Sequence, residues 1–389
     1  MTSVAVASTG LRDREAGTDL ADQIRNGLGG DAPDAVLVFA SSQNDYEPLL
    51  EALQAGCNPA ALIGCSSAGE FTETTDGMGR SSAIALRAPE MRFTAVSAQG
   101  LATDHAAAAR KIVRGFSGLA SAEYRYRTAI ILLDALAGHA EEIVDEMTQE
   151  TGGMYRFAGG GAGDDGKFSK THVFHGVEAH TDAVVALEIL SNKPIGIGSK
   201  HGWGPSGDVL RITESAQSCV LSFNVAPAVE AFEEHAALTG QTFDHADPLP
   251  FFLHNIVGVT TEQGHKLRVP LGIAPGGGIV HAAEIPIGTT AHIMSIPPTA
   301  AVEAATSATL DAIGQVAEAG HRPSGALFLD CVATRLRLGH GFDDELAAVS
   351  NALGNISYAG FNSYGQIVRA EGQFSGFHNC TAVVVVFPE

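Results

Sequence analysis

The sequence predicts an α/β protein of two related domains, whose mixed sheets are built from a repeated helix–strand–glycine-turn–strand unit. Two observations support this class. Short apolar runs rich in β-branched residues, such as 35–40, alternate with stretches of helical period, such as 46–55. A turn with glycine at both ends also recurs along the chain. Hydrophobic residues make up 45% of the chain and charged residues 17%, which is enough apolar material for sizeable cores.

The individual elements follow from apolar periodicity along the chain. Strands are predicted at 4–7, 35–40 and 130–136, and helices at 13–28, 46–55, 139–150, 226–237 and 299–319. The segment 171–222 has the pattern of strand and turn. A chain of 389 residues favours two domains, at roughly 100–200 residues each. We place the boundary between Gly207 and Pro227, which gives domains of residues 1–215 and 216–389.

The recurring turn is the most informative pattern. It consists of glycine, four residues, a second glycine, a long polar residue and a large apolar one. Three copies are present, at 64–71, 161–168 and 360–367. Each precedes an apolar strand, predicted at 82–86, 183–187 and 382–387. A fourth copy at 272–279 is weaker, because glycine holds its polar position. Glycine permits positive φ and close backbone approach, so the turns are expected to present amides and polar side chains to one shared face. The alternative is that they are ordinary glycine turns.

Charge and cysteine content exclude several classes. Lys and Arg number 23 and Asp and Glu 44, a net charge of −21 that repels phosphate backbones and anionic lipid heads. We therefore expect no nucleic-acid or membrane partner. The apolar runs are too short to cross a bilayer, and the N-terminus has no secretory pattern. The five cysteines are scattered without C-x-x-C spacing, which argues against a disulfide framework or a structural zinc site and favours a cytoplasmic location.

No complete catalytic constellation is visible, so we predict a binding protein rather than an enzyme. Residues 161–167 resemble a phosphate-binding loop, but Phe168 stands where Ser or Thr is required. Ser66 lacks the glycine spacing of a nucleophile elbow, so Ser66 and Ser67 are expected to bond the turn backbone. The alternative is a thiol-dependent enzyme with Cys331 as nucleophile, a histidine base and Arg335 or Arg337 as the activating cation.

Two of the 15 histidines occupy positions at which iron could be bound. His378 opens an apolar strand beside the C-terminal glycine turn, and His201 lies beside Trp203, the only tryptophan. A histidine at the mouth of an apolar pocket can ligate haem iron. The alternative is that each is a hydrogen-bonding residue. No histidine spacing matches a zinc helix motif, and no metal site is predicted.

Several of these segments resemble the FIST family. Residues 63–71, 157–168, 171–174 and 200–205 resemble its N-terminal domain, and 325–335, 359–367 and 378–381 resemble its C-terminal domain. The resemblance covers nearly the whole chain. It implies a sensory protein that recognises small ligands, amino acids or related metabolites among them, and that acts through a histidine kinase or another signalling output. Some members of the family resemble haem-based nitric-oxide sensors.

Both halves of the chain are accounted for, so we expect no further output domain and a signal that passes through a separate protein or an oligomer. A scaffold without a ligand is the remaining alternative. The residues expected to bind the ligand are Gly64, Ser66, Ser67, Glu70, Cys331, Arg335, Gly360, Gln366, His378 and Asn379. If haem is bound, His378 or His201 would be its ligand. Gln366 stands where the family usually has Glu, which removes one carboxylate that could meet a ligand's amino group.

Overall fold

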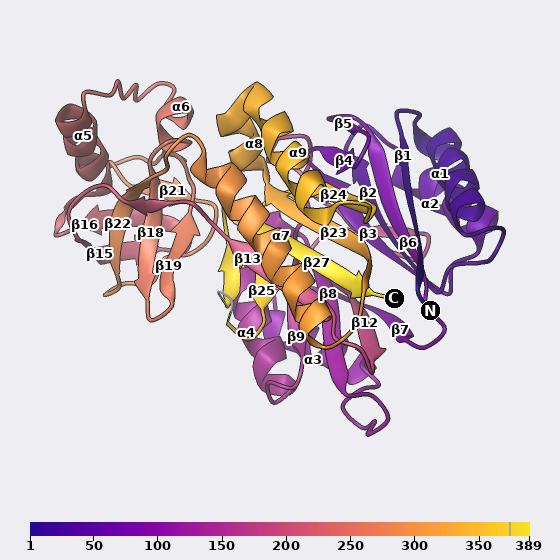
Figure 1. Ribbon diagram of the computed structural model, residues 1–389. Helices are drawn as coiled ribbons and strands as arrows, with labels where there is room; N and C mark the ends of the chain where they lie inside the picture. The colour runs from indigo at the N-terminus through magenta and orange to yellow at the C-terminus, as the bar shows by residue number, and fades with distance from the viewer. Residues whose placement is uncertain (373–374) are drawn as a thin grey trace.

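The structure, a computed structural model, describes residues 1–372 and 375–389. It contains helices and four sheets, three of six strands and one of nine, with parallel and antiparallel neighbours. The predicted α/β class with mixed sheets is therefore confirmed. In Figure 1 the nine-stranded sheet lies at one end of the molecule, and the three six-stranded sheets make up the rest. Within the described residues, no helix is long and apolar enough to span a bilayer.

The three six-stranded sheets are built by three copies of one unit. In each unit, helices connect the first three strands, and a short hairpin then leads to the fourth and last strand. The first unit comprises β1 (Ser3–Thr9), α1 (Asp13–Gly27), β2 (Ala35–Ser41), α2 (Tyr46–Cys57), β3 (Ala61–Ser67), the hairpin β4 (Glu70–Thr72) and β5 (Asp76–Gly77), and β6 (Ser81–Arg87). The second comprises β7 (Arg92–Gln99), α3 (His105–Gly115), β8 (Tyr126–Leu133), α4 (Ala140–Glu150), β9 (Arg156–Gly161), the hairpin β10 (Val173–His175) and β11 (Glu178–His180), and β12 (Ala183–Ser191).

The third unit has the same plan with a large insertion. It comprises β13 (Gly196–Lys200), α7 (Ala300–Glu318), β23 (Pro323–Cys331), α8 (Val332–Leu338), α9 (Phe342–Leu353), β24 (Tyr358–Ser363), the hairpin β25 (Gln366–Arg369) and β26 (Gly376–His378), and β27 (Ala382–Pro388). The strand orders are β1-β6-β2-β3, β7-β12-β8-β9 and β13-β27-β23-β24. In each, the last two strands are parallel, as β2 and β3 are, and the others antiparallel. The repeat seen in the sequence is thus a repeat of the fold.

Each unit gives its hairpin to the sheet of another unit. The strand β4 of the first unit pairs with β24 of the third, β25 of the third with β9 of the second, and β10 of the second with β3 of the first. The exchange closes a ring in which every unit both gives and receives a hairpin. The three units therefore form one interlocked body with pseudo-threefold symmetry.

Equivalent glycines allow this arrangement. Gly64 pairs with Val38, Gly159 with Ile131 and Gly360 with Phe328 across the parallel strand pairs. A Cβ on these three glycines would lie 2.0, 1.8 and 2.0 Å from the carbonyl oxygen of that partner. Such distances are far inside van der Waals contact, so no side chain fits.

The structure corrects two of the predicted copies, one in its register and one in its assignment as a copy. In the second unit the structural counterpart of Gly64 is Gly159, two residues before the predicted Gly161. A run of glycines in β9 left the choice open. The predicted fourth copy at 272–279 lies in the nine-stranded sheet, around the hairpin of β20 (Pro270–Ile273) and β21 (Ile279–His281), and is not a copy of the unit.

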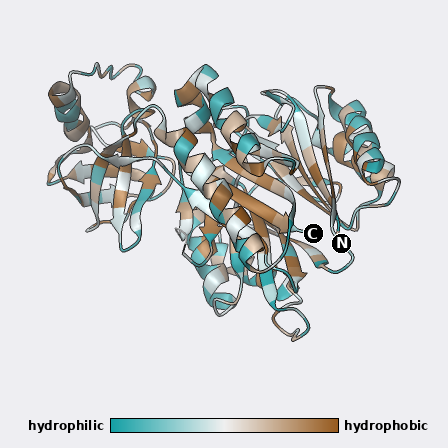
Figure 2. Ribbon diagram, in the orientation of Figure 1, coloured by the Kyte–Doolittle hydropathy of each residue, from teal (hydrophilic) through white to brown (hydrophobic). Residues whose placement is uncertain are grey.

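The inner faces of the three sheets share one core, and helices cover their outer faces. Leu37, Ile130 and Leu327 occupy equivalent positions in β2, β8 and β23, and all three are fully buried in this core. Apolar clusters beneath α1 and α2, α3 and α4, and α7 and α9 form the outer layers. Figure 2 accordingly shows hydrophobic strands beneath amphipathic helices. Strands buried on both faces explain the continuous apolar runs in the sequence.

The insertion lies between β13 and α7, where the other units have only a short connection. It is a mainly antiparallel sheet with its own apolar core. Its elements are β14 (Gly204–Pro205), β15 (Leu210–Ala216), β16 (Cys219–Phe223), β17 (Ala226–Pro227), α5 (Ala228–Thr239), α6 (Leu249–Phe252), β18 (Ile256–Thr261), β19 (Gly264–Arg268), β20, β21 and β22 (Thr290–Ser295). We call residues 204–295 the inserted domain. The division at 215/216 remains a prediction.

Candidate functional site

The turns that follow β3, β9 and β24 meet in a ring of backbone hydrogen bonds. The N–H of Ala68 donates to the carbonyl of Asn362 at 2.9 Å, that of Gly163 to Ser66 at 2.8 Å, and that of Tyr364 to Gly161 at 3.0 Å. The three bonds are equivalent under the pseudo-threefold symmetry. Together they bring the ends of the parallel strands of all three units to one place, which is where α/β folds commonly bind ligands.

Beside this ring, one position in each unit is an acceptor of backbone hydrogen bonds. It is occupied by Ser41 at the end of β2, Asp134 after β8 and Cys331 at the end of β23. The N–H two residues later donates to each side chain, at 3.2 Å from Gln43 to Ser41 Oγ and 3.1 Å from Leu136 to Asp134 Oδ1. Ala333 donates to Cys331 in the same way. We call these the three strand-end positions.

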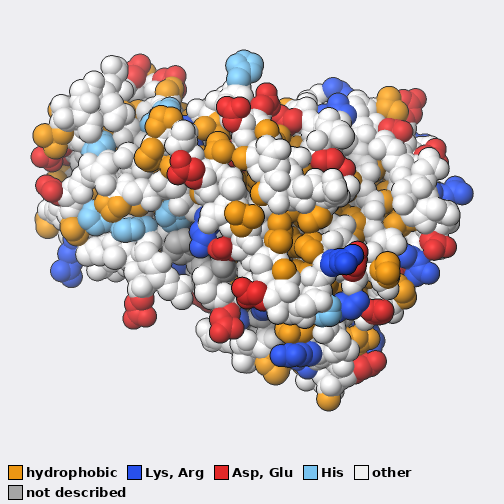
Figure 3. Space-filling model, in the orientation of Figure 1, with side chains coloured by type: hydrophobic (Ala, Val, Ile, Leu, Met, Phe, Trp, Pro, Cys, Tyr) orange, Lys and Arg blue, Asp and Glu red, His pale blue; other side chains and the backbone are white. Residues whose placement is uncertain are grey.

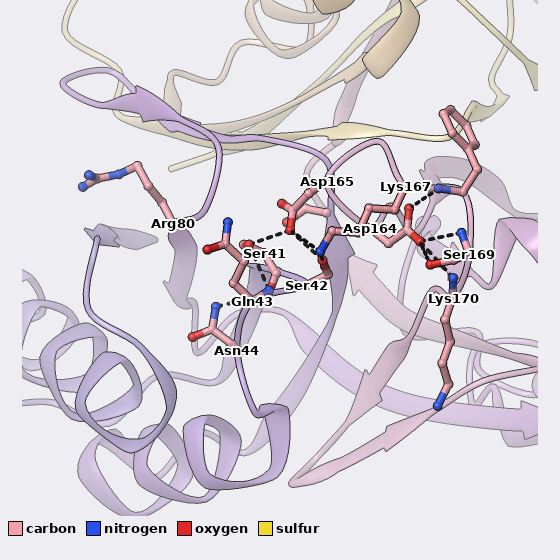
Figure 4. A network of polar contacts seen from close by, with 12 residues as sticks. Ser41, Ser42, Gln43, Asn44, Arg80, Asp164, Asp165, Lys167, Ser169 and Lys170 are labelled. Atoms are coloured by element: carbon pink, nitrogen blue, oxygen red, sulfur yellow. Dashed lines mark hydrogen bonds and ion pairs between the residues drawn. The ribbon is translucent and has the colours of Figure 1, made fainter.

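Side chains close the strand-end position of the first unit. Ser41 Oγ donates to Asp165 Oδ2 at 2.9 Å, and Ser42 Oγ donates to the same oxygen at 2.6 Å (Figure 4). Lys167 Nζ donates to Ser42 Oγ at 2.8 Å and lies 3.8 Å from Asp165 Oδ2. The lysine of the phosphate-loop-like segment is thus engaged within the protein.

The strand-end position of the second unit is closed as well. Thr171 Oγ1 donates to one oxygen of Asp134, and the N–H of Asp182 donates to the other at 2.7 Å. Asp134 is 6% exposed. Both oxygens of its carboxyl group therefore accept hydrogen bonds from within the protein.

The strand-end position of the third unit opens into a pocket instead. Cys331, Val332, Ala333, Tyr364 and Asn379 of the third unit line this pocket. The other walls come from the second unit, with Ala135, Leu136 and Phe168, and from the inserted domain, with Val269, Leu271 and Ala282. Its volume is about 50 Å³, room for a group of a few heavy atoms. We call it the Cys331 pocket.

The ring of Phe168 stacks on that of Tyr364 at one wall of the Cys331 pocket, with centroids 4.3 Å apart. Tyr364 is held in turn by a hydrogen bond from its hydroxyl to Asp164, which also accepts from the N–H groups of Phe168, Ser169 and Lys170. Figure 4 shows part of this network around Asp164. The aromatic pair is therefore well fixed, and the lining is mostly apolar.

Glu70 and Gln366 occupy equivalent positions and make equivalent contacts. Ser67 Oγ donates to one oxygen of Glu70, and the N–H of Arg80 donates to the other at 3.0 Å. Gln366 Nε2 donates to Ser363 Oγ at 2.7 Å, and its Oε1 accepts from the N–H of Thr381 at 3.2 Å. Both side chains are fully buried. Glutamine makes both contacts without carrying a charge. This explains why Gln366 can stand where the family usually has Glu.

Burial raises the pKa of Glu70 to about 8, although the hydrogen bonds from Ser67 and Arg80 favour the carboxylate. Glu70 is therefore largely protonated at neutral pH. Neither Glu70 nor Gln366 lines the Cys331 pocket.

The other predicted ligand residues are spread around the ring. Ser66 Oγ accepts from the N–H of His172 at 2.9 Å. Arg335 makes two bonds to Asp76, at 2.7 and 3.0 Å, and one to Asn362 at 3.0 Å, which ties the third unit to the hairpin of the first. Gly64 and Gly360 lie within β3 and β24, against the backbone of the parallel neighbours β2 and β23. The structure thus brings Cys331 and Asn379 together at the pocket and leaves the remainder as its framework.

The two histidines proposed for haem do not stand at a cavity that fits a porphyrin. His378 has no exposed surface, and burial lowers its pKa well below the usual value. His201 lines a pocket of about 10 Å³, room for roughly one water. Pockets that hold drug-sized ligands have volumes of roughly 300 Å³ or more, and haem is larger than most such ligands. The residues present around His378 and His201 therefore do not fit haem.

One group of side chains has the composition of a metal site. His139, Glu142 and Glu284 offer ligand atoms that all lie within 4.8 Å of one another. They join the start of α4 to the inserted domain. The Glu142 and Glu284 carboxyls hydrogen-bond to each other, so a shared proton can satisfy them without a metal.

Sequence reasoning missed most of the pocket wall. Asp134 and Cys331 each follow an apolar strand run at the same place in the repeat, and aligning the units on Gly159 rather than Gly161 would have related them. Val269, Leu271 and Ala282 carry no comparable signal, because an inserted domain's packing is not encoded by the repeat.

On the face seen in Figure 3, acidic and basic side chains are interspersed, and histidines gather on the inserted domain, where His265 and His292 pack edge to face.

Comparison with known proteins places the chain in a family. Residues 34–225 match the FIST N domain and 228–369 the FIST C domain. Two uncharacterized proteins of Mycobacterium tuberculosis, from strains CDC 1551 and H37Rv, are each 24% identical over 400 residues, covering 98% of both chains. Among solved structures, cyanuric acid hydrolase from A. caulinodans aligns at 8% identity and TM-score 0.34 over 99% of both chains. T. maritima PurL complexed with AMPPCP aligns at 12% identity and TM-score 0.25, over all of this chain and 72% of that one. By its two matched domains, the chain belongs to the FIST family.

Proposed function

We propose that this protein is a small-molecule-binding sensory protein of intracellular signal transduction, and that its ligand occupies the Cys331 pocket. FIST domains are associated with signalling and with sensing of small ligands. The observation that carries the proposal is the difference between the three strand-end positions. Ser41 and Asp134 are closed by internal partners, whereas Cys331 opens into a pocket at the same place in the fold.

The lining specifies the class of ligand. Apolar side chains dominate, and the polar groups are the sulfur of Cys331 and the amide of Asn379. A small, mostly apolar molecule with one hydrogen-bonding group is complementary to this surface. Glu70 lies outside the lining, so a ligand ammonium meets no carboxylate there. Amino acids are therefore a less favoured class than uncharged or weakly acidic metabolites.

The walls suggest how binding is transmitted. They come from the second unit, the third unit and the inserted domain. A ligand that binds one relative position of these three parts more tightly than another therefore shifts the equilibrium between the two conformations. A separate output protein, such as a histidine kinase, would read this change. Five free cysteines support a location in the reducing cytoplasm.

Filling the pocket tests this proposal. Ala333 lines the pocket and is 7% exposed, so Ala333→Leu should occupy the space that a ligand needs. A thermal-shift screen of short-chain alcohols, amides, carboxylic acids and amino acids is expected to give compounds that raise the Tm of the wild type and not of the variant. The control is Ala317→Leu, on an exposed position of α7, which should respond like the wild type. Equal shifts in Ala333→Leu and the wild type would place the ligand elsewhere.

A thiol-dependent enzyme is the second candidate, and the low pKa of Cys331 favours it. Hydrogen bonds from the Cys380 thiol and from backbone N–H groups lower that pKa to about 7. The residues that line the Cys331 pocket include no histidine to serve as the base. Nucleophilic catalysis with a histidine base is therefore less well supported than ligand binding.

A further inference from the structure

Cys331 and Cys380 form a reduced pair beside the Cys331 pocket. Cys331 ends β23, and Cys380 lies just before β27, the antiparallel neighbour of β23. The thiol of Cys380 hydrogen-bonds the sulfur of Cys331. Both residues are free cysteines packed in one cluster with Val269 and Ala333. Leu329 pairs with Val383, which places Cys331 and Cys380 at the adjoining ends of neighbouring strands, where a disulfide can join two cysteines.

The surroundings divide the roles of the two sulfurs. Cys331 accepts hydrogen bonds from the Cys380 thiol, from the backbone N–H groups of Cys380 and Ala333, and from Gln366. These donors lower its pKa although burial opposes them. The pKa of Cys380 is raised well above the usual value, first by its hydrogen bond to Cys331 and then by burial. Cys331 therefore ionises before Cys380, so Cys331 supplies the thiolate of the pair and Cys380 the thiol.

The pseudo-threefold symmetry provides independent support for an anion at this position. In the second unit the equivalent residue is Asp134, a carboxylate. It accepts from the N–H groups of Leu136 and Asp182, which correspond to Ala333 and Cys380. The same backbone donors thus surround a carboxylate in one unit and a sulfur in another. Such backbone donors favour a negatively charged side chain at the strand end, although the first unit has the neutral Ser41 there.

Access distinguishes Cys331 from a sulfur that is merely buried. It is 2% exposed, yet it lines the Cys331 pocket, whereas Cys380 does not. A small oxidant that enters the pocket meets the Cys331 sulfur first. Cys380 is 6% exposed and lines a separate pocket of about 10 Å³, room for roughly one water, so a larger molecule reaches the pair from the Cys331 pocket.

We propose that Cys331 is a peroxide-reactive thiolate and that Cys380 is its resolving thiol. The Cys331 thiolate attacks the distal oxygen of a hydroperoxide, so that an S–O bond forms, the O–O bond breaks and an alkoxide or hydroxide leaves with the electron pair. The Cys380 sulfur gives up its proton, attacks the Cys331 sulfenic acid and displaces hydroxide, which leaves as water. The two sulfurs lose two electrons to the peroxide. The disulfide alters the lining beside Asn379 and so links redox state to the pocket, whatever molecule the pocket binds.

Cys219 is the internal control for reactivity. It lies in β16 and is more exposed than Cys331, but burial raises its pKa. At about pH 7 the reduced full chain should be alkylated by iodoacetamide about tenfold faster at Cys331 than at Cys219, since the thiolate is the nucleophile. The rate at Cys331 should reach half its maximum near pH 7. If Cys219 reacts first, or if Cys331 reacts only at alkaline pH, the proposal is wrong.

Oxidation tests the pair itself. With hydrogen peroxide, the wild type and Cys219→Ser should each lose two hydrogen masses and yield a peptide linked through Cys331 and Cys380. The Cys380→Ser variant should stop at a sulfenic acid on Cys331 that dimedone traps, and Cys331→Ser should form no linked peptide. Serine occurs naturally at the equivalent Ser41, so Cys331→Ser is expected to keep the wild-type Tm. A link between other cysteines, or a folded Cys380→Ser chain without a dimedone adduct on Cys331, would overturn the proposal.

Discussion

Replacing Gly64 with alanine is expected to destabilise the native fold severely. The new Cβ would lie 2.0 Å from the carbonyl oxygen of Val38, 2.8 Å from a methyl carbon of Val38 and 3.0 Å from the ring of Phe174. The first contact is with backbone in the middle of a fully buried sheet, so it cannot be relieved by a change of rotamer. Separating β2 from β3 would disturb the common core and the pairing of β3 with β10. We expect a loss of roughly 4 kcal/mol or more, at the extreme of single substitutions.

Gly159→Ala and Gly360→Ala should have the same effect, because their contacts with Ile131 and Phe328 are equivalent. Gly314→Ala is the matched control. It lies in α7 with nothing within 4 Å of the added Cβ, and should gain about 0.5–1 kcal/mol. Urea unfolding followed by circular dichroism measures all four variants. Wild-type stability in Gly64→Ala would show that β2 and β3 are not paired in this register.

Glu70→Gln is expected to stabilise the protein at alkaline pH and to remove part of its pH dependence. Burial raises the pKa of Glu70 from 4.5 to about 8 in the folded state. Below the unfolded pKa both states are protonated, and Glu70 carries no penalty. As pH rises to about 8, the unfolded chain ionises while the folded one retains its proton, so folded stability falls. Above this range the penalty is of the order of 5 kcal/mol.

The glutamine variant should escape this penalty, because Gln366 already makes the equivalent contacts with Ser363 and Thr381. The readout is the difference in unfolding free energy between Glu70→Gln and the wild type, measured from about pH 5 to about pH 9. It should grow in favour of the variant across the interval. The control, Glu234→Gln on an exposed face of α5, should give a flat difference. A flat difference for Glu70→Gln as well would mean that the carboxylate is ionised in the fold.

The sequence predicted the elements and the repeat better than it predicted their assembly. The apolar runs of β2, β6, β12 and β27 are long and buried on both faces, so their composition alone identifies them as strands. The middle copy was misplaced by two residues because several glycines in β9 fit the spacing. Only the contact of Gly159 with Ile131 decides between them.

The exchange of hairpins could not be predicted from local pattern. The strand β4 has three residues, and its partner β24 lies almost 300 positions further along the chain. A segment this short has no periodicity that specifies a partner. The Cys331 pocket depends on that exchange and on the inserted domain, which is why Cys331 and Asn379 were named as candidates while Leu136, Phe168 and Val269 were not.

The most direct test of the proposed function is to identify what the protein retains from the cell. Wild type, Ala333→Leu and Ala317→Leu would be purified from the same cells in parallel, denatured, and the released small molecules identified by mass spectrometry. We expect a small, mostly apolar compound with the wild type and with Ala317→Leu, in amounts comparable with the protein, and none with Ala333→Leu at an unchanged fold. The same compound retained equally by all three proteins would contradict a ligand site in the Cys331 pocket.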